Sequence, residues 1–172
     1  MIIWLNGAFG SGKSSVAENI CKRLDAAHLY DPEQVGFFLW ENLPREMKSG
    51  DNFQHIPLWR EFNRKILKYM DDNYAGVLVV PMTIYIKKYY DEIIGQLMKE
   101  NVRVRHFILT ASRETIVDRL IQRGDGSDCW AAQHIDQCLK AFDHEICEEK
   151  IDTERKSIDE IAAEIIRRSG IK

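Results

Sequence analysis

Apolar residues along the chain form two kinds of run, which are short continuous runs and longer runs that repeat every three to four positions. Continuous apolar runs span residues 2–5 and 76–81, and further strands are predicted over residues 26–30, 102–109 and 149–153. Continuous apolar segments of this length are typical of strands that are buried on both faces of a parallel sheet. The periodic runs between them have the spacing of amphipathic helices. The pattern therefore predicts a three-layer α/β fold, with five parallel strands flanked by helices.

The periodic runs also predict which side each helix buries. Helices are expected after residue 14, over 33–43, 57–73 and 87–100, after residue 112, over 129–147, and after a capping box that begins at Ser157. The apolar stripe of the helix over 57–73 consists of Leu58, Phe62, Ile66 and Met70. Its other sides carry Trp59, Arg60 and Asn63. In the helix over 87–100 the inward residues are Ile93, Ile94, Leu97 and Met98.

The segment between the first strand and the first helix carries the strongest chemical motif. It reads Gly7, Ala8, Phe9, Gly10, Ser11, Gly12, Lys13, Ser14 and Ser15, and it matches the phosphate-binding loop G-x-x-x-x-G-K-[ST]. Glycines let backbone N–H groups converge on an anion, and the following helix contributes its positive end. Lys13 is suited to the β- and γ-phosphates, and the Ser14 hydroxyl to Mg²⁺. A glycine-rich turn without a ligand is the weaker alternative.

Asp31 follows the second predicted strand, at the edge where open α/β sheets bind ligands. It is either a ligand or metal contact or a turn residue that caps the next helix. The strand over 76–81 ends in Pro81, where many phosphate-loop enzymes have an aspartate that holds Mg²⁺ through water. Ser14 and Asp31 are therefore the candidate metal ligands.

Arg119 and Arg123 lie one helical turn apart and lead into the polar segment Gly124–Asp128. Two arginines beside a glycine-rich loop favour a lid, over about residues 119–135, that closes over phosphates. The alternative is surface pairing with nearby acidic residues.

Residues 31–75 are the expected substrate-binding region. The aromatic run Phe37–Trp40 precedes a polar, mobile-looking loop over 44–57, and together they could line a pocket. If Arg60 faces the cleft, it offers a bidentate donor to the substrate. Exposed to water instead, it is only a solvated charge.

Composition places these motifs in one domain spanning residues 1–172, with 45% hydrophobic residues, 30% charged residues and a net charge of −3. The chain has no basic stripe, so nucleic acid is not an expected partner. Its four cysteines form no C-x-x-C pair and are expected to be free thiols. Without a leader or a long apolar segment, a cytoplasmic location is expected. A monomer and a homodimer both remain open.

Taken together, the segments 2–13, 30–36, 57–63 and 79–84 resemble the bacterial tunicamycin-resistance ATP-binding proteins. The resemblance continues through 105–107, 130–132 and 151–153, and thus covers nearly the whole chain. It places the chain among the P-loop small-molecule and nucleoside-monophosphate kinases. The strand end without aspartate is what this family's pattern implies. Guanine-reading Asn-Lys-x-Asp and transporter Leu-Ser-Gly-Gly-Gln segments do not occur.

The resemblance implies binding of ATP and Mg²⁺, and binding or modification of a small molecule such as a tunicamycin-like nucleoside antibiotic. Its matching segments suggest substrate contacts at Asp31, Glu33, Trp59, Arg60 and Thr83. By the same resemblance, the nucleotide base lies between the lid arginines and the loop near Asp152 and Thr153.

Two main functions compete. In a small-molecule kinase, Lys13, Arg119 and Arg123 would act on the phosphates, and Asp31 would orient or deprotonate an acceptor hydroxyl. In an ATP-gated binding protein, the same site would sequester a toxic ligand without chemistry. A regulatory NTPase is a third, weaker hypothesis.

Overall fold

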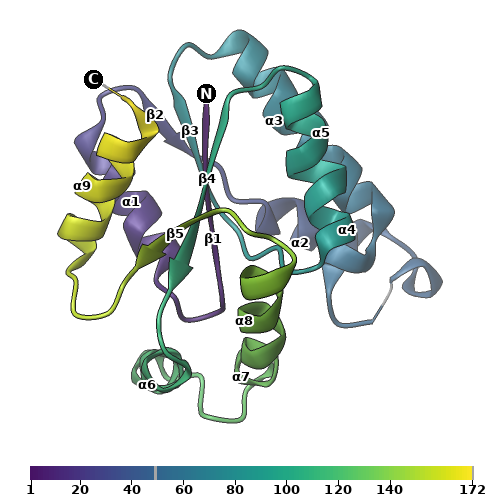
Figure 1. Ribbon diagram of the computed structural model, residues 1–172. Helices are drawn as coiled ribbons and strands as arrows, with labels where there is room; N and C mark the ends of the chain where they lie inside the picture. The colour runs from purple at the N-terminus through teal and green to yellow at the C-terminus, as the bar shows by residue number, and fades with distance from the viewer. Residues whose placement is uncertain (49, 172) are drawn as a thin grey trace.

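The computed structural model describes residues 1–48 and 50–171 of the chain, and over these residues it contains one parallel sheet. The strands are β1 (Ile2–Gly7), β2 (Ala27–Leu29), β3 (Val77–Pro81), β4 (Val104–Thr110) and β5 (Glu149–Asp152). They are arranged in the order β2-β3-β1-β4-β5 (Figure 1). All five strands that the periodicity predicts are present, and the α/β fold is confirmed.

Helices cover both faces of the sheet. On one face lie α1 (Lys13–Arg23) and α9 (Ile158–Ser169), as Figure 1 shows. On the other face lie α2 (Glu33–Asn42), α3 (Pro57–Asn73), α4 (Lys87–Tyr90), α5 (Gln96–Lys99) and α8 (Ile135–His144). The remaining helices, α6 (Arg113–Arg123) and α7 (Trp130–Gln133), lie beyond the carboxyl ends of the strands.

Alternation along β1 divides the core between the two faces. Ile3 and Leu5 pack with residues of α1 and α9, whereas Ile2 and Trp4 pack with residues of α2, α3, α5 and α8. Because each face of the strand is covered, all six β1 residues are buried. The sheet thus holds the loop after β1 on a rigid strand at the center of the molecule.

The buried side of α3 differs from the predicted stripe. The buried residues are Trp59, Arg60, Asn63 and Leu67, whereas Leu58, Phe62, Ile66 and Met70 are only half-buried. The physical reason is that the polar groups on the inner side have partners. The Trp59 indole donates to the Pro32 carbonyl at 3.0 Å, and the Asn63 side chain accepts from the Tyr30 hydroxyl at 2.7 Å. Hydrogen-bonded polar groups can be buried where unpaired ones cannot.

Two predicted helices differ from their expected form. The helix over 87–100 has a π-helical segment, Asp91–Gly95, between α4 and α5, and Met98 at its end is exposed rather than buried. A wider turn shifts the angular position of every residue after it. The predicted helix over 129–147 is two helices, α7 and α8, separated at His134.

Other elements match their predictions. The last strand is present as β5, and the capping box holds, with the Ser157 hydroxyl accepting from Glu160 N–H at 3.2 Å. The polar loop over 44–57 contains two short 3₁₀ helices, Arg45–Met47 and Phe53–His55. The four cysteines are free thiols. Within the described ranges, no helix is both long and apolar enough to cross a membrane.

Candidate functional site

The loop after β1 is tied to the neighbouring strand by one buried amide side chain. Asn6 donates from Nδ2 to the Ile84 carbonyl and accepts at Oδ1 from Ile84 N–H and Gly7 N–H, each at 2.9 Å. Thr83 adds a hydroxyl that donates to the Gly7 carbonyl at 2.8 Å. The segment after β3 thereby holds the start of the phosphate loop in place.

Backbone geometry in the loop explains two of its glycines. Gly7 has φ of 138°, and a Cβ there would lie 2.6 Å from the Leu109 carbonyl oxygen. Gly12 has φ of 94° immediately before α1, in the left-handed region that favours glycine. These conformations allow the loop to curl around an anion at the helix N-terminus.

Lys13 lies inside this curl. Its ammonium group donates to the carbonyls of Gly7 at 3.1 Å and Ala8 at 2.9 Å. The pKa of Lys13 is lowered from 10.5 to about 8, chiefly by burial and in part by nearby Arg123, while Cys138 and Glu33 act in the opposite direction. A half-buried ammonium group whose hydrogen-bond partners are neutral carbonyls is available to bind an anion.

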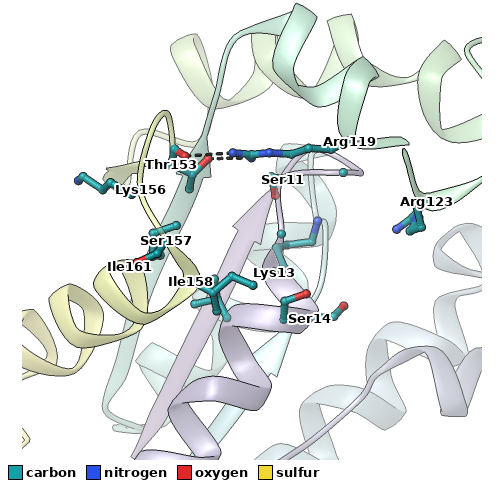
Figure 2. Close-up of a pocket in the computed structure, with 14 residues that line it drawn as sticks. Ser11, Lys13, Ser14, Arg119, Arg123, Thr153, Lys156, Ser157, Ile158 and Ile161 are labelled. Carbon is teal, nitrogen blue, oxygen red and sulfur yellow. Dashed lines mark hydrogen bonds between the residues drawn. The ribbon is translucent and has the colours of Figure 1, made fainter. Parts of the chain in front are cut away.

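A cavity of about 620 Å³ extends from this loop (Figure 2). One end is formed by residues 10–16, and the other end by the start of α9 and the loop before it, with Thr153, Lys156, Ser157, Ile158 and Ile161. Arg119 crosses between these ends, donating to the Thr153 hydroxyl and carbonyl at 3.0 Å each. The cavity therefore has a polar end at the loop and a partly apolar end at α9.

The residues of this cavity fit a nucleotide. Ser11 is buried, lines the cavity, and its hydroxyl has no partner among the described residues, so it is available to a phosphate oxygen. For a divalent cation, the exposed Ser14 hydroxyl is the available donor beside the loop. No group of three potential metal ligands of the His, Cys, Asp or Glu type occurs in the described part of the chain. This donor set suits Mg²⁺, which keeps several waters and takes substrate phosphates as ligands.

A smaller cavity of about 190 Å³ has Phe9 of the phosphate loop in its lining. Its apolar lining residues are Phe9, Trp40, Phe53, Met82 and Trp130. Its polar lining residues are Glu33, Asp51, Asn52 and Gln54. Because Phe9 belongs to the phosphate loop, this cavity adjoins the place where the phosphates would lie.

Comparison with known proteins identifies the family. An AAA domain family model matches residues 2–144. The chain belongs to this family. No match is found among curated proteins.

Several solved structures share the fold of this AAA domain protein. The tunicamycin resistance protein of Deinococcus radiodurans is 29% identical, with a TM-score of 0.85 over 99% of this chain and 96% of that one. A gluconokinase from Sinorhizobium meliloti 1021 has a TM-score of 0.66 at 17% identity, covering 98% and 90% of the two chains. Shikimate kinase from Acinetobacter baumannii has a TM-score of 0.62 at 17% identity, covering 99% and 95%. The first likeness confirms the resemblance seen in the sequence, and the other two show a shared fold.

The two carboxylates at the start of α2 have different surroundings. Both oxygens of Asp31 face their own chain, accepting from Glu33 N–H at 2.9 Å and from the Gln34 amide at 3.0 Å. Asp31 thus organises the start of α2, which was the turn alternative for this residue. Glu33 lines the smaller cavity. Glu33 is exposed, and partial desolvation raises the pKa of its carboxyl group; Asp31 adds to the rise, and Lys13 and Arg123 oppose it.

Three residues with predicted substrate contacts lie beneath the smaller cavity and are not among its lining residues. Trp59 packs against Phe53, with ring centroids 5.4 Å apart. Arg60 is buried, donates to Glu92 and to the Gln54 carbonyl, and stacks on Tyr89 with its guanidinium carbon 4.2 Å from the ring centroid. Thr83 holds Gly7, as described above. In this structure all three contact residues that line a cavity or form the phosphate loop, and none of the three lines the smaller cavity.

The lid arginines differ from one another. Arg119 is anchored on Thr153, whereas Arg123 is exposed and pairs with Asp125 in the following loop. Both line the larger cavity together with residues of the phosphate loop, and their contact with phosphates stays a prediction.

Sequence reasoning missed several lining residues. Lys156 and Ile158 line the larger cavity, and Asp51, Gln54 and Trp130 line the smaller one. The only signal for Asp51 and Gln54 was their position in a polar loop after an aromatic helix. Trp130 was marked only by the family resemblance over 130–132 and by its place in the predicted lid, and its ring lies 5.0 Å from that of Phe9 across a long sequence separation.

Proposed function

We propose that this protein is an ATP-dependent phosphotransferase that acts on a hydroxyl group of a small molecule, such as a tunicamycin-like nucleoside antibiotic. The observation that carries the proposal is the smaller cavity beside Phe9 of the phosphate loop. A site for a second small molecule next to the phosphates is what a kinase requires, and what a simple ATPase does not need. The similarity to a tunicamycin resistance protein supports the choice of acceptor.

In this proposal the loop over residues 7–15 binds the triphosphate through its N–H groups, Ser11 and Lys13. The exposed Arg123 leaves Asp125 and turns to the phosphates, while Arg119 holds the lid against Thr153 at the base end of the cavity. Ser14 would hold Mg²⁺, which neutralises charge on the phosphates when it is bound. Most of the rate would come from positioning and charge stabilisation.

The test is single-turnover transfer from γ-labelled ATP in the presence of Mg²⁺, with and without tunicamycin, followed by mass analysis of the ligand. We expect tunicamycin to gain the mass of one phosphoryl group. Binding of both ATP and tunicamycin without a change in mass would contradict phosphoryl transfer and favour sequestration. A Lys13→Met control should lose transfer while retaining the fold, since it removes the ammonium group from the loop.

A further inference from the structure

The smaller cavity has charged groups of one sign. Among the described residues that line it, Glu33 and Asp51 are the ionisable ones, and no lysine or arginine contributes. Arg60, the nearest candidate on α3, is occupied by Glu92 and the Gln54 carbonyl beneath the cavity. A carboxylate or phosphate on the bound molecule would meet two like charges, with no cation among the described lining residues to pair with.

The side-chain oxygen of Gln54 favours a bound molecule that carries a hydrogen-bond donor. The residue is 2% exposed, and its amide nitrogen donates to the Thr83 carbonyl at 2.9 Å. That contact fixes which end of the amide is oxygen, because a carbonyl accepts only from the N–H side. The remaining Oε1 atom has no partner within the described chain. A hydroxyl or N–H group of a bound molecule would satisfy it.

Aromatic side chains form the rest of the lining. The rings of Trp40 and Phe53 meet edge to face, with centroids 5.1 Å apart, and those of Phe9 and Trp130 do so at 5.0 Å. Such surfaces bind the apolar faces of sugar rings and flat heterocycles. The cavity therefore combines ring-binding surfaces, one unmet acceptor atom and negative charge.

Of the two carboxylates at the start of α2, Glu33 is the one placed for chemistry. It lines the cavity beside Phe9, while both Asp31 oxygens are held by the first turn of the helix. Of these two carboxylates, Glu33 is therefore the one that reaches the acceptor cavity.

We propose that the smaller cavity selects an acceptor that carries hydroxyl groups and no negative charge, and that Glu33 is the base that receives the proton of the attacking hydroxyl. This inference rests on the phosphotransferase function proposed above. In the transfer step the acceptor oxygen forms a bond to the γ-phosphorus as the bond from that phosphorus to the β–γ bridging oxygen breaks. ADP leaves with the bond's electron pair, and the hydroxyl proton passes to the Glu33 carboxylate. Asp31 is a positioning residue that orients Glu33 through the first turn of α2.

The first experiment compares Glu33→Gln with the wild-type protein, using tunicamycin as the uncharged acceptor. We expect the single-turnover rate to fall about 10²- to 10⁴-fold, the range typical of a lost general base. Binding of tunicamycin and of a non-hydrolysable ATP analogue, followed by tryptophan fluorescence, should change less than about threefold, because Gln keeps the size of the side chain. The pH–rate profile should lose its acidic limb.

The matched control is Glu41→Gln, which changes an exposed carboxylate on the same helix that lines neither cavity. Its rate should equal that of the wild type. Asp31→Asn retains an oxygen that can accept from Glu33 N–H, and its rate should fall less than that of Glu33→Gln. A larger loss in Asp31→Asn than in Glu33→Gln would overturn the assignment of the proton to Glu33, as would a Glu33→Gln rate within threefold of wild type. If Glu33→Gln unfolds, the Glu33→Asp variant, which should keep the acidic limb and part of the rate, replaces it.

The second experiment tests the charge selection. Gluconate and shikimate, which are anionic hydroxyl compounds, should give transfer rates at least about 100-fold below that of tunicamycin, and should not compete with tunicamycin for binding. Equal transfer to either acid, or competition by either, would overturn the selection. If tunicamycin binds and no phosphoryl group is transferred, the proposed function fails. Whether gluconate or shikimate competes with tunicamycin for binding still tests the charge selection in that case. Failure of tunicamycin to bind beside the ATP analogue would overturn the assignment of the cavity.

Discussion

Asn6 and Lys13 illustrate how single side chains shape the phosphate loop. Asn6 is fully buried and makes three hydrogen bonds that join β1 to the segment after β3. Lys13 is held by two loop carbonyls and has a lowered pKa. The first residue gives the loop its position, and the second gives it a charge that responds to pH and to phosphate.

Replacing Asn6 by alanine should destabilise the protein by about 3 kcal/mol, because it leaves the Ile84 N–H and C=O and the Gly7 N–H without their side-chain partner. Urea unfolding followed by circular dichroism measures the loss. Asn73→Ala is the control, since Asn73 is exposed and bonds only within its own helix. Equal effects of the two substitutions would contradict the linking role of Asn6.

Binding of ATP should take up a proton at high pH. In the free protein Lys13 is protonated below its pKa of about 8 and neutral above it. Phosphate favours the ammonium form, so the pKa of Lys13 rises on binding. Below pH 8 Lys13 is already protonated, so ATP binding takes up no proton there. Above pH 8 the affinity for ATP should fall about tenfold per pH unit, until the pH reaches the pKa of Lys13 in the ATP-bound state. Calorimetry in buffers of different ionisation enthalpy at pH 7 and pH 9 measures the uptake, and the Lys13→Met variant should show none of this contribution.

Among the secondary-structure elements, α3 is the one that positions the smaller cavity. Its first turn carries Arg60, which connects the loop containing Gln54 with the segment after α4 through Glu92. Stacking on Tyr89 holds the guanidinium plane in place. A single buried cation thus joins three elements under the acceptor cavity.

Arg60→Lys should lower the free energy of unfolding by about 2 kcal/mol, because a lysine cannot make both contacts in the geometry of the guanidinium fork. The same change should weaken tunicamycin binding and leave ATP-analogue binding unchanged, since only the loop with Gln54 loses its anchor. The control is Arg64→Lys, at a half-exposed pair with Glu100, where the cost should stay below about 1 kcal/mol. Loss of ATP binding in Arg60→Lys would contradict this separation of the two cavities.

Across the whole molecule, the lid is joined to the rest of the protein by the buried side chains of Ile116 and Leu120 and by polar contacts of its arginines. Helices α6 and α7 lie beyond the strand ends in Figure 1, and Arg119 anchors α6 to the loop after β5. The exposed pair of Arg123 with Asp125 is a weak contact that phosphate can replace. The molecule thus combines a rigid sheet with a lid that can exchange partners.

An ATP analogue should slow hydrogen exchange over residues 120–135, because Arg123 would gain the phosphates as partners and draw the lid over them. Arg123→Ala should remove most of this protection. Asp125→Ala frees Arg123 from its exposed pair and should keep the protection. Identical protection in all three proteins would show that Arg123 does not close the lid.

Most of the fold could be predicted from local patterns in the sequence. The strands, the helix over 57–73, the capping box at Ser157 and the phosphate loop could be predicted, because each depends on neighbouring residues alone. The π-helical segment and the break at His134 could not, since they are local departures from a pattern that continues through them.

The amino-acid sequence by itself therefore determined the order of elements and the phosphate loop, whose chemistry lies within nine consecutive residues. Only the tertiary structure decided which side of α3 is buried, where Arg60 points, and which of Asp31 and Glu33 faces a cavity. These outcomes depend on contacts such as those of Asn6 with Ile84 and Arg60 with Glu92, between residues far apart along the chain. Sequence spacing fixes a residue's place on a helix, whereas the packing of that helix fixes what the residue faces.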